Sequence, residues 1–388
     1  MPLFLIAWYA LFGVYIILLV YGWYRWKRLP SDGVPDVRHE LFLTVIIPVR
    51  NEAENIIALL NDLAAQDYSS ELYEVIVVDD HSTDHTSDLV RQFITSRHSN
   101  MRLLLAGDSN ESLPSPKKNA LAYGISHARG QCIVTTDGDC RVGSLWLASH
   151  AHKLQQSNIK LVAGPVFFYH EKGWLQKSQG LELAALIGTG AISLDSGAAG
   201  MANGANLSFW LSAFHKVGGY RGNEHVISGD DEFLLRKIHG QFPESVAFMK
   251  SRNAIVTTAP CADFIALFQQ RRRWAGKWKL HRDIFSLLLP FFVFVFHLGW
   301  IATLGILLTH FAFIWLILST FILKTAVEFL FLQAIRSFGE KKVSFPVLVL
   351  LQLLYPFYVV FFGIMANAGG FTWKGRTYSA HTHDRRRV

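Results

Sequence analysis

The sequence predicts an α/β domain with a parallel sheet, joined to apolar helices that are long enough to cross a membrane. Two observations support this prediction. Between residues 41 and 136, short apolar segments that fit buried strands alternate with segments of helical periodicity. Apolar residues make up 51% of the 388 residues, and they are concentrated near the two ends of the chain. A chain of this length has room for one large or two medium domains.

The N-terminal segment, residues 1–24, is predicted to be an uncleaved membrane anchor. Leu3–Trp23 carries no charged side chain and is long enough to span a bilayer as a helix. A cleaved signal peptide has basic residues before its apolar segment, but here the basic residues follow it, at Arg25–Arg28. The positive-inside tendency therefore predicts that the chain after this helix is cytoplasmic. Residues 25–40 are predicted to be a linker.

Residues 41–280 are predicted to form the α/β domain. Strands that alternate with helices at this spacing are typical of βαβ units, whose parallel sheet is covered on both faces. Residues 141–260 are richer in glycine and less periodic, which favours an extension of the sheet with mixed strand directions. No G-x-G-x-x-G motif follows the first strand, so a dinucleotide site of the Rossmann type is disfavoured. The predicted strands are Leu43–Val49, Glu74–Asp80, Met101–Ala106 and Gln131–Thr136, and helices are predicted around Ile56–Leu63, Leu89–Ile94 and Asn119–Ala128.

Net charge indicates the kind of partner, and cysteine content indicates the redox compartment. The formal net charge is +7, but basic residues cluster beside apolar segments, as at Arg271–Arg273 and Arg385–Arg387. That placement favours a membrane surface over a nucleic-acid groove, and we expect no nucleic-acid partner. The three cysteines have no C-x-x-C spacing, which favours a reducing compartment over a disulfide framework or a structural zinc site.

Residues 281–370 are predicted to hold three C-terminal membrane helices. Lys324 and Glu328 interrupt the second apolar segment, but they lie four residues apart and can pair on one helix. Three spans after a cytoplasmic domain would place the basic tail, residues 371–388, outside, against the positive-inside tendency. Either one apolar segment is re-entrant or interfacial, or the tendency fails here. The three apolar segments are Ile284–Thr309, Phe311–Leu332 and Val343–Ala366.

Acidic side chains follow the ends of the predicted strands. Asp137-Gly138-Asp139 follows one strand, Asp79 and Asp80 end another, and Glu52 comes shortly after Pro48. The carboxyl ends of parallel strands meet at the edge where open α/β sheets bind ligands. Two carboxylates at this spacing can hold one hard divalent cation, which can bind a diphosphate. The alternative for the Asp-Gly pair is a turn that closes a hairpin.

Two other sets of polar residues expected at this edge of the sheet each have a functional and a purely structural interpretation. Asn51 and Ser82 or Thr83 are good helix caps, although a cap does not explain two consecutive acids. Lys117-Lys118 opens the third predicted helix, where ammonium groups beside a helix N-terminus suit a phosphate; the alternative is a solvated basic face.

Two motifs later in the chain complete the candidate site. In Asp230-Asp231-Glu232 one acid is a candidate general base, or all three mark a helix N-terminus that the helix dipole stabilises. Gln270–Trp274 contains three arginines followed by tryptophan, and taken alone it fits an interfacial anchor of arginine and aromatic residues.

Taken in chain order, these motifs resemble the family 2 glycosyltransferases of GT-A fold. The match is best with the membrane-bound branch, which includes cellulose, chitin and hyaluronan synthases and the ceramide glucosyltransferases, and which shares a Q-x-x-R-W signature. The resemblance covers residues 41–280 and extends to the flanking helices. The tail segment Trp373–Arg376 is also similar to one that follows the last span in such enzymes, where it is expected on the cytoplasmic side.

The resemblance implies a donor site and an acceptor site. Asp80, together with Asp79 and Glu52 near Pro48, would hold the base and ribose of a nucleotide sugar, with Lys117 near the nucleotide. Asp139, helped by Asp137, would bind Mg²⁺ or Mn²⁺ on the diphosphate. Asp231 would be the catalytic base, although Asp230 stands where the family more often has glutamate, which leaves the neighbouring acid as an alternative. Gln270, Arg273 and Trp274, with Asp230, would contact the acceptor and the diphosphate.

The implied function is that of an integral-membrane inverting glycosyltransferase. It would move a sugar from a nucleotide sugar, by family inheritance a UDP-sugar, to a hydroxyl of a lipid or lipid-linked acceptor. A processive polysaccharide synthase needs a channel, so that alternative calls for a partner subunit or a homo-oligomer. A membrane transporter or scaffold with a degenerate sugar-nucleotide domain would have lost acids that are present here. The expected location is the bacterial plasma (inner) membrane, with the catalytic domain in the cytoplasm.

Overall fold

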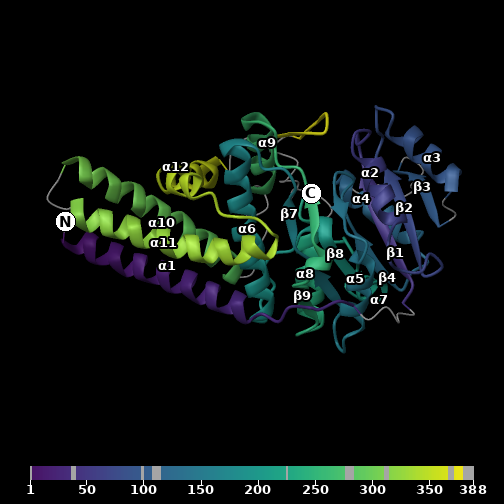
Figure 1. The fold of residues 1–388 in the computed structure, drawn as a ribbon, viewed down its shortest axis with the longest axis horizontal. Coiled ribbons are helices and arrows are strands. Elements are labelled where there is room, and N and C mark those ends of the chain that lie inside the picture. Colours follow the sequence, from purple (N-terminus) through teal and green to yellow (C-terminus); the bar gives the residue numbers. More distant parts are fainter. Residues whose placement is uncertain are drawn as a thin grey trace, which may run out of the picture. The chain divides into compact units, whose positions relative to one another are not determined.

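The computed structural model of the chain consists of two compact units (Figure 1). The sheet unit comprises Leu29–His170 and Thr189–Ala259, and the helix unit comprises Met1–Arg28, Glu171–Gly188 and Pro260–Val388. Residues 260–275, which were expected within the domain 41–280, group with the long helices. The structure describes residues 2–35, 41–97, 100–106, 115–223, 226–275, 284–309, 314–365 and 371–378, so the basic residues Arg385–Arg387 lie outside the described part.

The sheet unit is built on a seven-stranded sheet in the order β3-β2-β1-β4-β8-β6-β9. Its first four strands in sequence pair in parallel, which confirms the predicted strands and their direction. β8 runs antiparallel between β4 and β6, so the extension has mixed directions, as expected. The strands are β1 (Leu43–Val49), β2 (Tyr73–Asp79), β3 (Met101–Leu105), β4 (Cys132–Thr135), β6 (Leu161–Ala163), β8 (Leu207–Trp210) and β9 (Val246–Phe248).

Helices cover both faces of this sheet because alternate side chains of a strand point to opposite faces. Val45 packs in one apolar cluster with α2, α3 and α5, whereas Ile46 packs in a second cluster with α4, α7 and α8. Gly124 allows α4 to approach closely, since a Cβ there would lie 2.9 Å from Ile46 Cγ2. The helices are α2 (Ile56–Ala64), α3 (Thr86–Arg97), α4 (Pro116–Ser126), α5 (Trp146–Gln155), α7 (Leu211–Lys216) and α8 (Asp230–Gln241).

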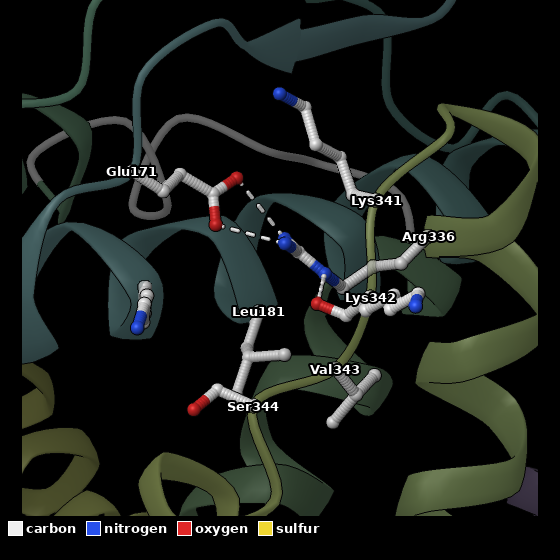
Figure 2. A pocket seen from close by; sticks show the side chains of 8 residues that line it. Glu171, Leu181, Arg336, Lys341, Lys342, Val343 and Ser344 are labelled. Carbon is white, nitrogen blue, oxygen red and sulfur yellow. Dashed lines mark hydrogen bonds and ion pairs between the residues drawn. The ribbon is translucent and has the colours of Figure 1, made fainter.

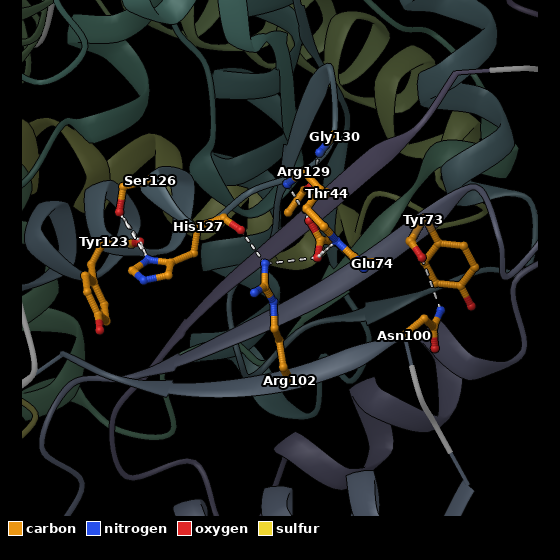
Figure 3. Close-up of polar contacts among 10 residues, drawn as sticks. All are labelled: Thr44, Tyr73, Glu74, Asn100, Arg102, Tyr123, Ser126, His127, Arg129 and Gly130. Carbon is orange, nitrogen blue, oxygen red and sulfur yellow. Dashed lines mark hydrogen bonds and ion pairs between the residues drawn. The ribbon is translucent and has the colours of Figure 1, made fainter.

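Buried Glu74 ties together the amino-terminal end of the sheet (Figure 3). Its side chain is 1% exposed, and Oε1 accepts hydrogen bonds from Thr44 Oγ1 at 2.8 Å and from the Arg129 backbone N–H at 2.6 Å. Oε2 accepts from the guanidinium groups of Arg102 and Arg129, each at 3.0 Å. One carboxylate therefore joins β1, β2, β3 and the turn before β4, at the end of the sheet opposite to the acids singled out above.

Four helices in the described part of the chain are long and apolar enough to cross a membrane. They coincide with the four apolar segments predicted from the sequence. They leave large apolar side chains exposed, among them Ile17, Phe291 and Trp315, as expected of surfaces that face lipid. The helices are α1 (Pro2–Arg28), α10 (Ile284–Thr309), α11 (Ile314–Phe338) and α12 (Phe345–Met365).

A long helix, α6 (Gly173–Asp195), contributes its first part to the helix unit and was not foreseen. Glycines obscure its helical periodicity in the sequence, yet they have a packing role. A Cβ on Gly188 would lie 2.2 Å from Ile335 Cδ1, so glycine permits α6 to lie directly against α11.

A polar network joins α1, α11 and α12. The predicted pair is confirmed, because Lys324 Nζ lies 2.7 Å from Glu328 Oε1. Glu328 also accepts hydrogen bonds from Tyr15 Oη at 2.5 Å and from Gln352 Nε2 at 2.6 Å. Further along, Trp26 Nε1 donates to the Ala334 carbonyl at 3.1 Å, so α1 and α11 run in the same direction and finish at the same end of the bundle.

The last apolar helix, α12, passes from α11 to α10 and then to α9. It begins near α11, where the rings of Phe345 and Phe329 are 6.0 Å apart, and continues past α10, where Tyr355 and His297 are 5.5 Å apart. It finishes beside α9 (Phe264–Ala275), the helix that precedes α10. The middle of α12, at Gln352, contacts Lys324 and Trp300, and both of its ends lie closer than Gln352 to the end of the bundle where α1 and α11 finish. This arrangement favours the re-entrant or interfacial alternative for one apolar segment.

Candidate active site

The carboxyl ends of β2, β1 and β4 are adjacent in the sheet, and they bring the predicted acids of the sheet unit to one edge. Pro48 lies within β1, Asp79 is the last residue of β2, and Asp137 follows β4. The Asp-Gly-Asp turn packs directly on the loop after β1, because a Cβ on Gly138 would lie 3.0 Å from Glu52 Cγ and 2.9 Å from Val49 Cγ1. Glycine is therefore required between the two aspartates, and β4 does not continue into the Asp-Gly hairpin that was the alternative.

The loops after β1 and β2 hold each other in a constrained conformation. Asn51 and His81 have φ angles of 52° and 55°, in the left-handed region that non-glycine residues rarely adopt. The Asn51 N–H donates to Ser82 Oγ at 3.0 Å, and Asn51 Oδ1 accepts from the Thr83 N–H at 2.8 Å. These residues thus link the two loops instead of capping helices.

Asp84 has the capping role at the start of α3, where its Oδ1 accepts from the Thr86 N–H at 3.0 Å. Partial burial acts to raise the pKa of Asp84, but hydrogen bonds from Thr86 and Ala53 outweigh it and lower the pKa overall.

The two acids that end β2 have different surroundings. Asp79 Oδ2 accepts from Ser87 Oγ at 2.6 Å, and Oδ1 accepts from the N–H and the hydroxyl of Ser82, so Asp79 holds the loop that follows it. Asp80 is 7% exposed, and its Oδ1 lies 3.2 Å from His81 Nδ1. Arg50 fixes the Asp80 backbone by donating to its carbonyl at 2.7 Å.

Lys117 connects the acids after β4 with the acids that begin α8. Its Nζ donates to Asp137 Oδ1 at 2.6 Å and lies 3.6 Å from Asp230 Oδ2. Burial alone would lower the pKa of Lys117, but the charges of Asp137, Asp230 and Asp231 outweigh it, so the pKa is raised above its usual value. The ammonium group therefore stays protonated at neutral pH.

Its neighbour Lys118 is completely buried and does not lie on a solvated basic face. Its Nζ donates to the carbonyls of Asn223 at 2.7 Å and Val226 at 2.8 Å, which holds the segment that leads into α8. Lys118 therefore stabilises the backbone that leads to the acids of α8, a role that the sequence did not predict.

Asp231 is oriented by two backbone amides. Its Oδ2 accepts from the Gly204 N–H at 2.9 Å, and its Oδ1 accepts from the Glu232 N–H at 2.7 Å. Gly229, with a φ of 82°, precedes α8, and Asp230, Asp231 and Glu232 form its first turn. The helix-dipole interpretation of these acids is thus correct, and it is compatible with a catalytic role for one of them.

Tyr169, which follows β7 (Val166–Phe168), belongs to the same region and was missed from the sequence. Partial burial and the charge of Asp139 raise the pKa of its phenol. Nothing in its sequence context distinguishes this tyrosine from others.

The donor set at this edge suits a hard divalent cation bound together with a substrate. Asp137 and Asp139 offer two carboxylates, and among the described residues no group of three His, Cys, Asp or Glu side chains is placed to hold a metal. Mg²⁺ commonly binds to one or two carboxylates and to substrate phosphates, so the two aspartates fit such an ion.

The helix unit carries Gln270, Arg273 and Trp274 on α9. Arg271, expected from the sequence only as part of a basic cluster at a membrane surface, is buried and organises this motif. Its guanidinium donates to Gln270 Oε1 and stacks 4.4 Å from the centre of the Trp274 ring. It also donates to Glu182 Oε2 at 3.1 Å and to Tyr358 Oη at 2.6 Å, so α6 and α12 hold α9 in place.

The tail segment Trp373–Arg376 forms a hairpin against the same helix. β11 (Phe371–Trp373) and β12 (Arg376–Tyr378) are joined through Lys374 and Gly375, which have φ angles of 45° and 77° as a two-residue hairpin turn requires. The Thr372 N–H donates to Gln269 Oε1 of α9 at 3.0 Å.

Comparison with known proteins gives a consistent result. The family model described as Glycosyl transferase family 21 matches residues 7–386. Glycosyltransferase AglE from Haloferax volcanii is 36% identical over 132 residues, and beta-monoglucosyldiacylglycerol synthase from Nostoc sp. is 25% identical over 251 residues. These alignments cover 34% and 64% of this chain, but only 41% and 51% of the two relatives. The solved structure of the mannosyltransferase PcManGT from Pyrobaculum calidifontis has a TM-score of 0.59 at 21% identity, over 87% of this chain and 98% of that chain.

Proposed function

The chain belongs to glycosyl transferase family 21, which confirms its resemblance to the family 2 glycosyltransferases, and we propose that it transfers a sugar from a nucleotide sugar to a hydroxyl of a lipid or lipid-linked acceptor. One observation carries the proposal: Lys117 joins Asp137 of the Asp-Gly-Asp turn to Asp230 at the start of α8. The acids proposed to bind the donor and the acids that include the candidate general base are thereby held in one cluster.

The donor is proposed to bind at the edge formed by β2, β1 and β4. Asp80 and Glu52 are assigned to the base and ribose, and Asp79 acts through the loop that it holds. Asp137 and Asp139 would hold Mg²⁺ or Mn²⁺, which when bound neutralises charge on the diphosphate. The structure of PcManGT was solved with GDP-Man and Mn²⁺, whereas the family resemblance favours a UDP-sugar. The experiment that tests the proposal therefore uses both UDP-sugars and GDP-mannose as donors.

Asp231 is proposed as the general base. Its carboxylate takes the proton of the acceptor hydroxyl, whose oxygen bonds to the anomeric carbon from the face opposite the diphosphate. The bond between that carbon and the diphosphate breaks, and its electron pair leaves with the nucleoside diphosphate, so the product has inverted stereochemistry. Gln270, Arg273 and Trp274 are assigned to the acceptor and the diphosphate from the sequence signature.

The apolar helices and one relative support the proposed acceptor and location. The name of the Nostoc protein states a glucosylated diacylglycerol as its product, and four candidate spans would keep this chain at a membrane. We propose an integral protein of the bacterial plasma membrane with the sheet unit in the cytoplasm.

The test incubates membranes that contain the full chain with labelled UDP-sugars and GDP-mannose, with and without Mg²⁺ or Mn²⁺. We expect metal-dependent release of nucleoside diphosphate and label in the lipid extract. Label in a polymer would instead indicate a processive synthase, and no transfer from any donor by wild-type membranes would contradict the proposal.

A further inference from the structure

We propose that the helix unit binds the phosphate of an anionic membrane lipid in a basic cavity beside the connection between α11 and α12 (Figure 2). The cavity has a volume of about 330 Å³, which is within the range of small-ligand sites. Four of its lining side chains are basic and one is acidic. They are Lys177, Arg336, Lys341, Lys342 and Glu171, and the other lining residues are Leu181, Val343 and Ser344.

A buried ion pair forms the rigid part of this site. Arg336 Nη1 and Nη2 donate to the two carboxylate oxygens of Glu171 at 3.1 and 2.8 Å, and both side chains are less than one tenth exposed. Arg336 Nε donates to the Lys342 carbonyl at 2.9 Å, which fixes the connection after α11. Glu171 in turn lies against Gly180 of α6, where a Cβ would be 2.5 Å from Glu171 Oε1. This pair is close to neutral, so it shapes the cavity without supplying its charge.

The net positive charge comes from three lysines on two separate elements. Lys177 lies on α6, while Lys341 and Lys342 lie between α11 and α12; Figure 2 shows the last two side chains leaving the connection on different sides. Ser344 directly precedes α12, so the positive end of that helix dipole adds to the same potential. Lysines on flexible stems around a preformed cavity suit a phosphate, which accepts hydrogen bonds from several directions.

The position of the cavity favours a lipid over a free anion. It lies at the end of α11, where Trp26 of α1 contacts Ala334, and the basic residues Arg25, Lys27 and Arg28 end α1. In a bilayer, this end of the bundle would be at the headgroup level of the leaflet with the basic residues. Basic pockets between membrane helices on that side are typical sites for anionic headgroups. The inference depends on the helix unit alone and not on the proposed glycosyl transfer.

The test measures lipid retention by native mass spectrometry of the full chain in detergent, with phosphatidylglycerol and phosphatidylcholine supplied in equal amounts. We expect preferential retention of phosphatidylglycerol. Lys342→Gln and Lys177→Gln should each weaken it about fivefold, because one lysine near an anionic headgroup contributes roughly that factor. Lys27→Gln is the matched control, since it removes one charge from the same end of the bundle outside the cavity.

Each outcome decides the proposal. An equal loss with Lys27→Gln would show unspecific surface attraction and overturn it, as would equal retention of the two lipids. Glycerol 1-phosphate is the soluble probe: if it displaced the lipid at a concentration similar to that of phosphatidylglycerol itself, the site would be one for a free anion and not for a lipid. Because Lys342 and Lys177 lie on different elements, unchanged retention in both variants would overturn the proposal even if one variant were unstable.

Discussion

Lys117 Nζ lies 2.6 Å from Asp137 and 3.6 Å from Asp230, so one ammonium group bridges two acids that are far apart in the sequence. Without it, the carboxylates of the proposed donor site and of the α8 N-terminus would repel each other. We expect Lys117→Met to lower turnover about 10²-fold, the usual effect of removing one preorganised charge from an active site. The measurement is label transfer in membranes, with exposed Lys216→Met as the control. Turnover within threefold of wild type would show that Lys117 has no part in the reaction.

Substitutions of Asp231 and of Asp139 should have different effects on donor binding and on turnover. Asp231→Asn keeps the shape of the side chain but removes the proton acceptor, so turnover should fall by about 10²–10⁴-fold while donor binding remains. Asp139→Asn should weaken metal-dependent donor binding and turnover together. Calorimetric titration with the nucleotide sugar and Mn²⁺ measures binding separately from transfer. If Asp230→Asn, and not Asp231→Asn, abolished transfer with donor binding intact, the base would be the neighbouring residue.

Arg271 is expected to position Gln270 and Trp274, although it lies outside the Q-x-x-R-W letters. Glu182→Gln removes the carboxylate that holds the Arg271 guanidinium, so α9 should lose its fixed orientation. Misplacement by about 1 Å can lower a rate by about 10²-fold. We expect lower turnover and a higher KM for both the acceptor and the donor, because this motif is assigned to the acceptor and the diphosphate. Arg272→Gln, on the next residue of α9, is the control; an equal effect from it would point to general damage to the helix.

Features that depend on local sequence patterns could be predicted, whereas features that depend on contacts between distant residues could not. β1, β2 and β4 could be predicted because burial on both faces leaves continuous apolar segments, and the acids after them stand at strand ends that topology brings together. The cluster around Lys117 depends on contacts with Asp137, 20 positions away, and with Asp230, more than one hundred positions away, and no local pattern encodes them. Arg271 is one of three consecutive arginines, and only its contacts with Glu182 and Tyr358 distinguish it. α6 was missed because its glycines obscure its periodicity, although Gly188 serves packing against α11.

His150 predicts a pH dependence of stability. The side chain is completely buried, with Nδ1 at 2.7 Å from Ser208 Oγ and Nε2 at 2.9 Å from Asn206 Oδ1. Burial lowers its pKa to about 4, so the imidazole stays neutral in the folded state. Unfolded chains bind a proton below pH about 6.5 that folded chains do not, and the free energy of unfolding should therefore fall as the pH drops from about 6.5 to 4.

The slope expected from this residue is up to about 1.4 kcal/mol per pH unit. Thermal unfolding of the full chain in detergent, followed between pH 7 and pH 4.5, measures it. His150→Gln should remove this part of the slope, whereas exposed His215→Gln should leave it. An identical slope in the His150 variant would show that other groups cause the acid sensitivity.

The path of α12 predicts that the C-terminal hairpin lies on the same side of the membrane as α9. Both ends of α12 lie closer than its middle to the same end of the bundle, and the Thr372 N–H donates to Gln269 of α9. A cysteine at Lys374 should therefore react with a membrane-impermeant maleimide from the same side as a cysteine at Lys216, in vesicles of known orientation. A cysteine at Trp315, which lies in the first turn of α11 and is 77% exposed, should react only from the opposite side. Cys261→Ser provides the background, because Cys132 and Cys140 are buried. Labelling of the Lys374 position together with the Trp315 position would mean that α12 crosses the membrane, and the basic tail would then break the positive-inside tendency.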